Sequence, residues 1–172
     1  MSTSFVKDQD LYKKVIETIS KAKNFVWIGT ADIKDLHVHY KGKVISFLEV
    51  LDQLAKNKIE IRLLHAKDPG ENFRRSFDKF PTLWKSMERQ LCPRVHFKII
   101  IIDGKLAYAG SANLTGAGLG IKSENTRNFE NGFITDDIDL LEQIMNQFDE
   151  VWMGKFCNLC KRKDYCKDPI IQ

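Results

Sequence analysis

Apolar positions in the first third of the chain alternate between helical and extended spacing. Residues 8–23 and 44–56 carry apolar side chains every third or fourth position, which predicts two amphipathic helices. Residues 25–28 and 59–64 are short apolar runs typical of buried strands. A strand, a helix and a strand in this order form a β-α-β unit, so we expect the two strands to pair in parallel.

The second half of the chain centres on four consecutive isoleucines, Ile99 to Ile102. A run that is apolar on both faces predicts a central strand rather than an edge strand. Asp103-Gly104 follows, a dipeptide that two-residue hairpin turns favour because both positions need positive φ. A further strand is expected over residues 129–134 and a long helix over 136–152. Together these elements predict an α/β fold with a mixed, mostly parallel central sheet and helices on both faces.

The expected hairpin gathers chemically active side chains at one place. If the residues flanking Asp103-Gly104 face each other, counting back along the strands places His96 opposite Ser111. Side chains alternate along a strand, so Lys98 and Asn113 should share the face of that pair. An imidazole, a cation, a hydroxyl and an amide on one patch predict a phosphate-binding site.

Asp103 should lie apart from this patch. It is seven residues from His96, roughly 23 Å along a strand that rises about 3.3 Å per residue. We therefore interpret Asp103 as a turn and capping residue rather than a proton relay to the histidine.

The spacing of these residues resembles the signature of the phospholipase D superfamily. The similarity follows the element order of the chain to about residue 153, which sets the expected catalytic domain at residues 1–153. The signature appears once, as in the small dimeric bacterial endonucleases of that superfamily. The matching residues are His96-x-Lys98-x4-Asp103-x6-Gly110-Ser111-x-Asn113, then Leu114-Thr115-x2-Gly118 and Asn128-x-Glu130-x-Gly132.

The resemblance implies a mechanism and a partner. Single-signature members pair as homodimers in which two sets of site residues meet at a two-fold axis. His96 of one subunit would then be the nucleophile and His96 of the other the general acid. Lys98 and Asn113 would bind the phosphate, Ser111 would support it, and Glu130 would orient an imidazole. The family chemistry requires no catalytic metal.

The substrate is less closely defined by the sequence. The net charge is +4, which permits an anionic partner. The N-terminus lacks the apolar core of a secretory signal, and no run approaches eighteen apolar residues, so we expect a cytoplasmic protein without a membrane partner. A nuclease that hydrolyses DNA or RNA is the main hypothesis. The alternatives are a phospholipase D or transphosphatidylase acting on phospholipids, and a non-catalytic module that binds nucleic acid.

Residues 71–91 are expected to form one or two short helices with several cations. The cations are either the solvated side of an amphipathic cover or a rim that contacts the phosphates of a polymer. They are Arg74, Arg75, Lys79, Lys85 and Arg89, interleaved with Phe73, Phe77, Phe80 and Trp84.

Residues 154–172 form a cysteine-rich tail that we expect to pack on the domain. Cys157, Cys160 and Cys166 have metal-ligand spacing, and Cys92 is the one cysteine left to serve as a fourth ligand. Four thiolates suit zinc, whereas the spacing with a distant upstream cysteine resembles the iron–sulphur staple of RecB-type nucleases. Free thiols or a disulfide are the alternative to a structural metal.

Overall fold

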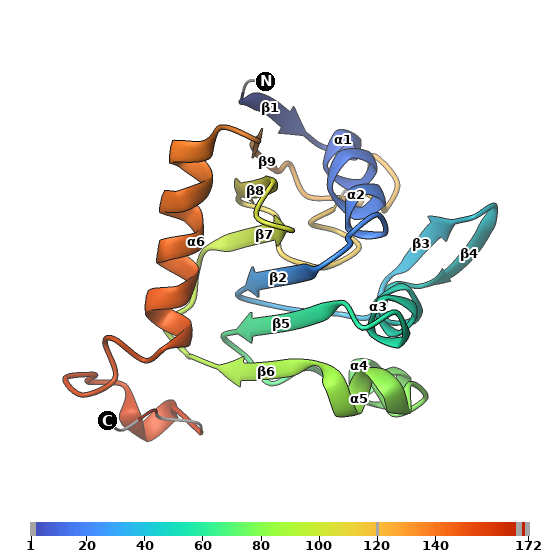
Figure 1. Ribbon diagram of the computed structural model, residues 1–172. Helices are drawn as coiled ribbons and strands as arrows, with labels where there is room; N and C mark the ends of the chain where they lie inside the picture. The colour runs from blue at the N-terminus through green and yellow to red at the C-terminus, as the bar shows by residue number, and fades with distance from the viewer. Residues whose placement is uncertain (1–2, 120, 168–169, 171–172) are drawn as a thin grey trace.

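A seven-stranded sheet forms the centre of the protein in a computed structural model that describes residues 3–119, 121–167 and 170 (Figure 1). Strand β7 occupies the middle of the sheet. The spatial order is β1 (Ser4–Lys7), β9 (Asn131–Thr135), β8 (Leu106–Gly110), β7 (Lys98–Ile102), β2 (Phe25–Thr30), β5 (Glu60–His65) and β6 (Glu88–Leu91).

The sheet is mixed, as predicted, but the prediction that it is mostly parallel was wrong. Only β2 with β5 and β5 with β6 pair in parallel, whereas β1 with β9, β9 with β8, β8 with β7 and β7 with β2 are antiparallel. The connections explain the difference. Parallel neighbours need a crossover, and helices provide one only between β2, β5 and β6. The tight turn between β7 and β8 allows only antiparallel pairing.

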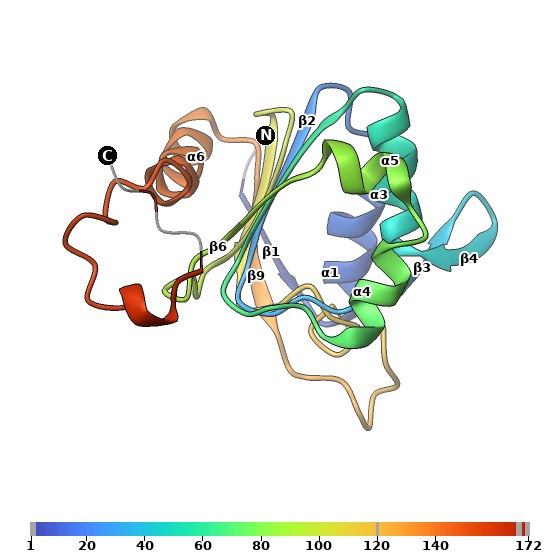
Figure 2. The ribbon, with the colours of Figure 1, turned by 90° about the horizontal axis from the view of Figure 1, so that it is seen from below.

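Helices cover both faces of the sheet, as predicted (Figure 2). The long helix α6 lies on one face, and helices α1 to α5 lie on the other. The elements are α6 (Ile138–Trp152) on the first face, and on the second α1 (Gln9–Leu11), the π-helical turn η1 (Tyr12–Ile16), α2 (Glu17–Ile19), α3 (Phe47–Lys56), α4 (Glu71–Phe77) and α5 (Pro81–Ser86).

The isoleucine run is the buried central strand that its pattern predicts. All residues of β7 are buried. Ile100 and Ile102 pack in the core under α1–α5, whereas Ile99 and Ile101 pack in the core under α6. The two cores therefore meet across one strand, which holds the start of β7 in a fixed position.

A two-stranded hairpin, β3 (His37–Tyr40) with β4 (Lys43–Ser46), projects from the domain beside α3 (Figures 1 and 2). Its turn contains Lys41 and Gly42, both at positive φ. The sequence pattern predicts that a helix begins at residue 44, whereas β4 continues to Ser46 and α3 begins at Phe47, so the hairpin is a further difference. Among the residues described, none of the helices is both long enough and apolar enough to cross a membrane.

The turn between β7 and β8 differs by one residue from the expected register. Asp103 and Gly104 have φ values of 55° and 61°, and the Lys105 N–H donates to the Ile102 carbonyl oxygen over 3.0 Å, as a two-residue turn requires. However, the ladder pairs Ile102 with Leu106, so Lys105 is an extra residue in the connection. The predicted pairing of His96 with Ser111 is therefore wrong. Lys98 pairs with Gly110, so the register is shifted by one residue, and His96 and Ser111 both lie just outside the ladder.

Candidate active site

His96 and Lys98 form the centre of the candidate active site at the start of β7. Lys98 is only 7% exposed, whereas His96 is exposed. The Lys98 ammonium donates to the His96 carbonyl oxygen over 2.7 Å, and its Nζ lies 3.5 Å from His96 Nδ1. The sheet thus holds a cation directly beside an imidazole that solvent and substrate can reach.

Burial makes Lys98 an unusual lysine. Loss of water around the ammonium lowers its pKa below the ordinary value of 10.5, although the negative charge of Glu130 acts in the opposite direction. A cation with little water around it interacts more strongly with a phosphate oxygen than a solvated surface lysine does.

Ser111 and Glu130 form a second group next to this pair. Ser111 directly follows Gly110, the residue that pairs with Lys98. The Ser111 hydroxyl donates to Glu130 Oε2 over 2.5 Å, and Asn128 Nδ2 donates to Glu130 Oε1 over 3.0 Å. Both carboxylate oxygens of Glu130 are therefore engaged within the protomer, so its role in orienting an imidazole stays a prediction.

Two paired glycines let the ends of β8 and β9 approach closely at Ser111. A Cβ on Gly110 would lie 2.3 Å from the Tyr108 hydroxyl and 2.4 Å from the Asn131 carbonyl oxygen. A Cβ on Gly132 would lie 2.5 Å from the Tyr108 ring. The glycines of the signature are thus required by packing under the site.

Asn113 lies on the segment after β8, and its place beside His96 and Lys98 stays a prediction. Its Oδ1 accepts from the Asp32 N–H over 3.1 Å and from the Thr30 hydroxyl over 3.4 Å. These bonds tie the amide oxygen to the end of β2 and leave Nδ2 as the end that can donate to a phosphate. Gly118 allows the following loop to close over Asn113, because a Cβ there would lie 2.6 Å from the Asn113 carbonyl oxygen.

Two supporting residues were not among those that the sequence pattern singles out. Thr30 donates to the Asp32 carbonyl oxygen and accepts from the Leu114 N–H. The Tyr108 hydroxyl accepts from the Ala112 N–H over 3.2 Å, and burial, with a further contribution from Glu130, raises the pKa of Tyr108 to about 12. The sequence could have indicated Thr30, because it is a polar residue at the end of an apolar strand. Tyr108 has no such signal, because its role depends on the pairing of β8 with β9.

Asp103 lies at the opposite end of β7 from this group. Its carboxylate accepts from the backbone N–H groups of Lys23, Asn24 and Phe25. The structure thus places Asp103 outside the site, at the start of β2, which agrees with its interpretation as a turn and capping residue.

The cations over residues 71–91 are exposed, whereas Phe73 and Phe77 are buried, so this stretch is an amphipathic cover with a basic outer side.

The buried lysine predicts an unusual pH dependence. Phosphate binding requires a charged Lys98, so its lowered pKa should make activity decline at alkaline pH earlier than an ordinary lysine would cause. Arginine stays charged over this range, so Lys98→Arg should lose that alkaline decline, with activity reduced roughly 10–100-fold by the altered geometry. Measurement of kcat/KM against pH for both proteins tests this. The same alkaline decline in both would contradict a role of Lys98.

Comparison with known proteins identifies relatives of the whole arrangement. A family model described as cardiolipin synthase, PLD-like domain, matches residues 15–152. Cardiolipin synthase 1 of Staphylococcus aureus is 29% identical over 129 residues, which are 68% of this chain and 25% of that protein. The major cardiolipin synthase ClsA of Bacillus subtilis is 26% identical over 127 residues, which are 66% of this chain and 25% of that protein. The chain therefore spans about a quarter of the length of the curated relatives that it matches.

Solved structures show the same fold at low sequence identity. NucT from Helicobacter pylori has a TM-score of 0.66 at 17% identity, with 88% of this chain and 95% of that chain covered. Nuc from Salmonella typhimurium, described as a phospholipase D family member, has a TM-score of 0.63 at 15% identity, with 88% and 93% covered. Phosphatidylserine synthase from Haemophilus influenzae has a TM-score of 0.58 at 17% identity, with 87% and 38% covered.

Proposed function

Because the chain belongs to the phospholipase D-like family, we propose that it is a phosphodiesterase whose substrate is a nucleic acid. The observation that carries this proposal is the exposed His96 imidazole held 3.5 Å from the buried Lys98 ammonium. This arrangement offers a nucleophile to the solvent and a fixed positive charge beside it.

The proposed reaction has two steps. The unprotonated nitrogen of His96 attacks phosphorus and displaces one ester oxygen, which forms a covalent phosphohistidine. Water then attacks the same phosphorus, and the histidine is released. Lys98 and the Asn113 amide stabilise the charge that develops on the phosphoryl oxygens in both steps. Ser111, fixed by Glu130, supports the same oxygens.

A homodimer would supply the general acid. The departing oxygen needs a proton, and general acid catalysis contributes about 10²–10⁴-fold to the rate. The chain carries one copy of the signature. His65, the last residue of β5, is buried, and its Nδ1 lies 2.7 Å from the Lys67 carbonyl oxygen. We therefore assign the proton transfer to His96 of a second subunit.

Features of the molecular surface favour a nucleic acid. Phe129 is 91% exposed and directly precedes Glu130, so an unpaired base could stack on its ring within reach of the site. The net charge of +4 and the basic outer side of residues 71–91 suit a phosphate polymer.

Phospholipid chemistry is the second candidate function. The family model and the curated relatives carry the name cardiolipin synthase, and the same site residues can transfer a phosphatidyl group. In that case the phosphohistidine would be resolved by an alcohol rather than by water.

A substrate panel separates these candidates. The full chain is incubated in excess chelator with plasmid DNA, single-stranded DNA, RNA and phospholipid vesicles, and the products are resolved by gel and by lipid chromatography. We expect cleavage of nucleic acid and unchanged lipid. Headgroup release or cardiolipin formation without nucleic-acid cleavage would favour the second candidate, and binding of nucleic acid without turnover would favour a non-catalytic module.

A shared active site makes activity depend on subunit pairing. Sedimentation equilibrium at micromolar concentration should give about twice the monomer mass of 19.9 kDa. Mixing wild-type subunits with an excess of His96→Asn subunits should lower activity further than dilution alone, because a mixed dimer lacks one of its two histidines. A monomeric active species, or activity strictly proportional to wild-type subunits, would contradict the dimer.

Phe129 provides a test of substrate recognition. Phe129→Ala should weaken binding of single-stranded DNA by roughly 5–150-fold, because stacking contributes about 1–3 kcal/mol per base. Fluorescence anisotropy with a labelled oligonucleotide measures the effect. Tyr165→Ala is the matched control, since Tyr165 is also exposed but lies in the tail. Equal binding by Phe129→Ala and wild type would remove the stacking role.

A further inference from the structure

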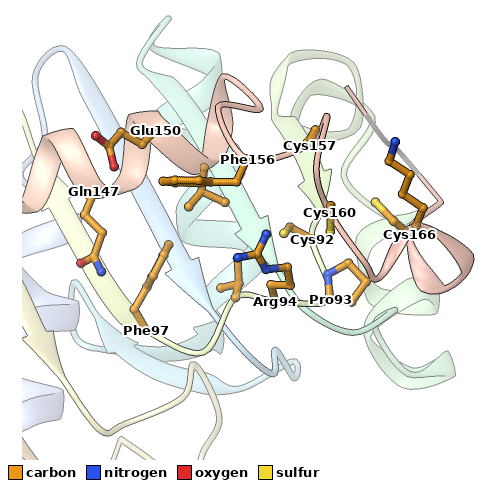
Figure 3. A pocket seen from close by; sticks show the side chains of 13 residues that line it. Cys92, Pro93, Arg94, Phe97, Gln147, Glu150, Phe156, Cys157, Cys160 and Cys166 are labelled. Atoms are coloured by element: carbon orange, nitrogen blue, oxygen red, sulfur yellow. The ribbon is translucent and has the colours of Figure 1, made fainter. Parts of the chain in front are cut away.

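The four cysteines of the chain line one cavity, although they come from two distant segments. Cys92 directly follows β6, whereas Cys157, Cys160 and Cys166 belong to the segment after α6. The cavity has a volume of about 290 Å³, and Figure 3 shows Cys92 on the sheet side with the other three on the tail. All four thiols are free and partly exposed.

A side-chain contact joins the tail to the end of β6, and hydrogen bonds within the tail shape the segment around its cysteines. Cys166 Sγ lies 3.9 Å from the carbonyl oxygen of Leu91, the residue before Cys92. The Cys160 N–H donates to the Cys157 carbonyl oxygen over 3.1 Å, which forms a turn between these two cysteines. The Arg162 N–H donates to Cys160 Sγ over 3.4 Å, a bond that stabilises a thiolate.

The residues around the cavity suit a negatively charged metal centre. Four thiolates around a divalent cation carry a net charge of −2. Arg94 and Lys163 line the same cavity and oppose that charge, whereas the Glu150 carboxylate, which also lines it, is paired with Lys155. The donor atoms are all sulphur, a set that selects zinc or iron–sulphur clusters over magnesium, calcium or manganese.

Binding would draw the cysteines closer together. In the described part of the chain, no three histidine, cysteine or acidic side chains are arranged as the ligands of a metal ion. Within the described tail, residues 154–167 contain only turns and the short 3₁₀ helix η2 (Lys163–Tyr165), so few backbone hydrogen bonds oppose an inward shift.

We propose that the four cysteines bind one thiophilic metal centre, a single zinc ion or an iron–sulphur cluster, that fastens the tail to the end of β6. This centre is structural and independent of the proposed nuclease activity. Cys92 is four residues before His96, and Arg94 and Phe97 line the same cavity. The metal therefore fixes the segment that leads into the active-site strand.

Metal analysis of the full chain tests the proposal. The protein is expressed in medium that contains zinc and iron, purified without oxygen or chelator, and analysed for zinc, iron and acid-labile sulphide. We expect one zinc per chain in a colourless protein, or iron with equal sulphide and absorbance at about 400 nm. Less than about a tenth of a metal centre per chain, or intact masses that show disulfides, would overturn the proposal.

Single substitutions identify the ligands. Cys92→Ser and Cys160→Ser should each reduce bound metal at least about tenfold. Leu159→Ser is the matched control, because this side chain lies between Cys157 and Cys160 in the sequence, is 92% exposed, and should leave the metal content unchanged when replaced. Full metal content in Cys92→Ser would exclude Cys92 as a ligand.

Metal removal from the wild-type protein gives a readout that does not depend on the folding of any variant. Treatment with a strong chelator should lower the melting temperature by roughly 5–10 °C, and the lost metal should restore it when added back. A melting temperature that responds to neither step would contradict a structural metal centre.

Discussion

Replacing His96 by asparagine should abolish turnover while leaving the fold intact. In the proposed mechanism His96 of one subunit is the nucleophile and His96 of the other is the general acid, so the substitution removes both groups. We therefore expect a loss of about 10⁴-fold or more in kcat. Because the side chain is exposed, its removal opens no cavity, and the melting temperature should change by less than about 2 °C. Single-turnover cleavage and thermal unfolding of the same preparation measure the two effects.

His37→Asn is the matched control for this substitution. His37 is also exposed, but it lies on the projecting β3–β4 hairpin. Its replacement should leave kcat within about twofold of wild type. Wild-type activity in His96→Asn would remove the covalent mechanism.

Asp103 should show the opposite behaviour, a large effect on stability and none on chemistry. Its carboxylate accepts from the N–H groups of Phe25, Asn24 and Lys23 at 3.0, 2.7 and 2.9 Å, which fixes the start of β2. Asp103→Ala leaves these groups without their acceptor and places alanine at a φ of 55°. We expect a loss of roughly 2–4 kcal/mol in the free energy of unfolding, with kcat unchanged below the melting temperature.

Asp103→Asn and pH separate the charge from the hydrogen bonds. Burial raises the pKa of Asp103, but the backbone N–H groups of Phe25, Asn24 and Lys23 outweigh it and lower the pKa. A lowered pKa stabilises the fold above the unfolded-state value of about 3.9, and this stabilisation is lost as pH falls through the folded-state value. Asp103→Asn keeps an acceptor oxygen, so it should lose less stability than alanine and show a weaker acid dependence. Denaturant unfolding at pH values between about 3 and 7, which span the unfolded-state pKa, measures both the loss of stability and its dependence on pH. A decrease in kcat in either variant would contradict a purely structural role.

Much of the fold follows from apolar patterning because it depends on local burial. The isoleucine run predicts a central strand, and β7 is buried on both faces. The periodic segments predict α3 and α6, which present apolar stripes to the sheet. Strand direction is a different kind of information, because β7 follows β6 in the chain but pairs with β2. Nothing in the local pattern encodes that choice.

His96 and Lys98 lie side by side as expected, because they are two residues apart; Lys98 begins β7 and His96 lies just before it. The extra Lys105 shifts the ladder by one residue, so the predicted register is wrong. The assignment of Ser111 and Asn113 to the same site stays a prediction. An extra residue beside a turn shifts which residues of the two strands pair, but it leaves the pattern of apolar residues in each strand unchanged. Thr30 and Asp32, which hydrogen-bond to Asn113, are 83 and 81 residues away in the sequence. A local sequence pattern does not predict contacts between residues so far apart.

The most direct test of the mechanism is capture of the covalent intermediate. The full chain is mixed with a nucleic-acid substrate in excess chelator, quenched within the first turnover under alkaline conditions, and examined by peptide mass spectrometry. We expect an acid-labile adduct in which the peptide that contains His96 carries the phosphorus still esterified to the remaining nucleic-acid fragment, and no such adduct in His96→Asn. Cleavage that proceeds without any histidine adduct and requires an added divalent cation would contradict the covalent mechanism.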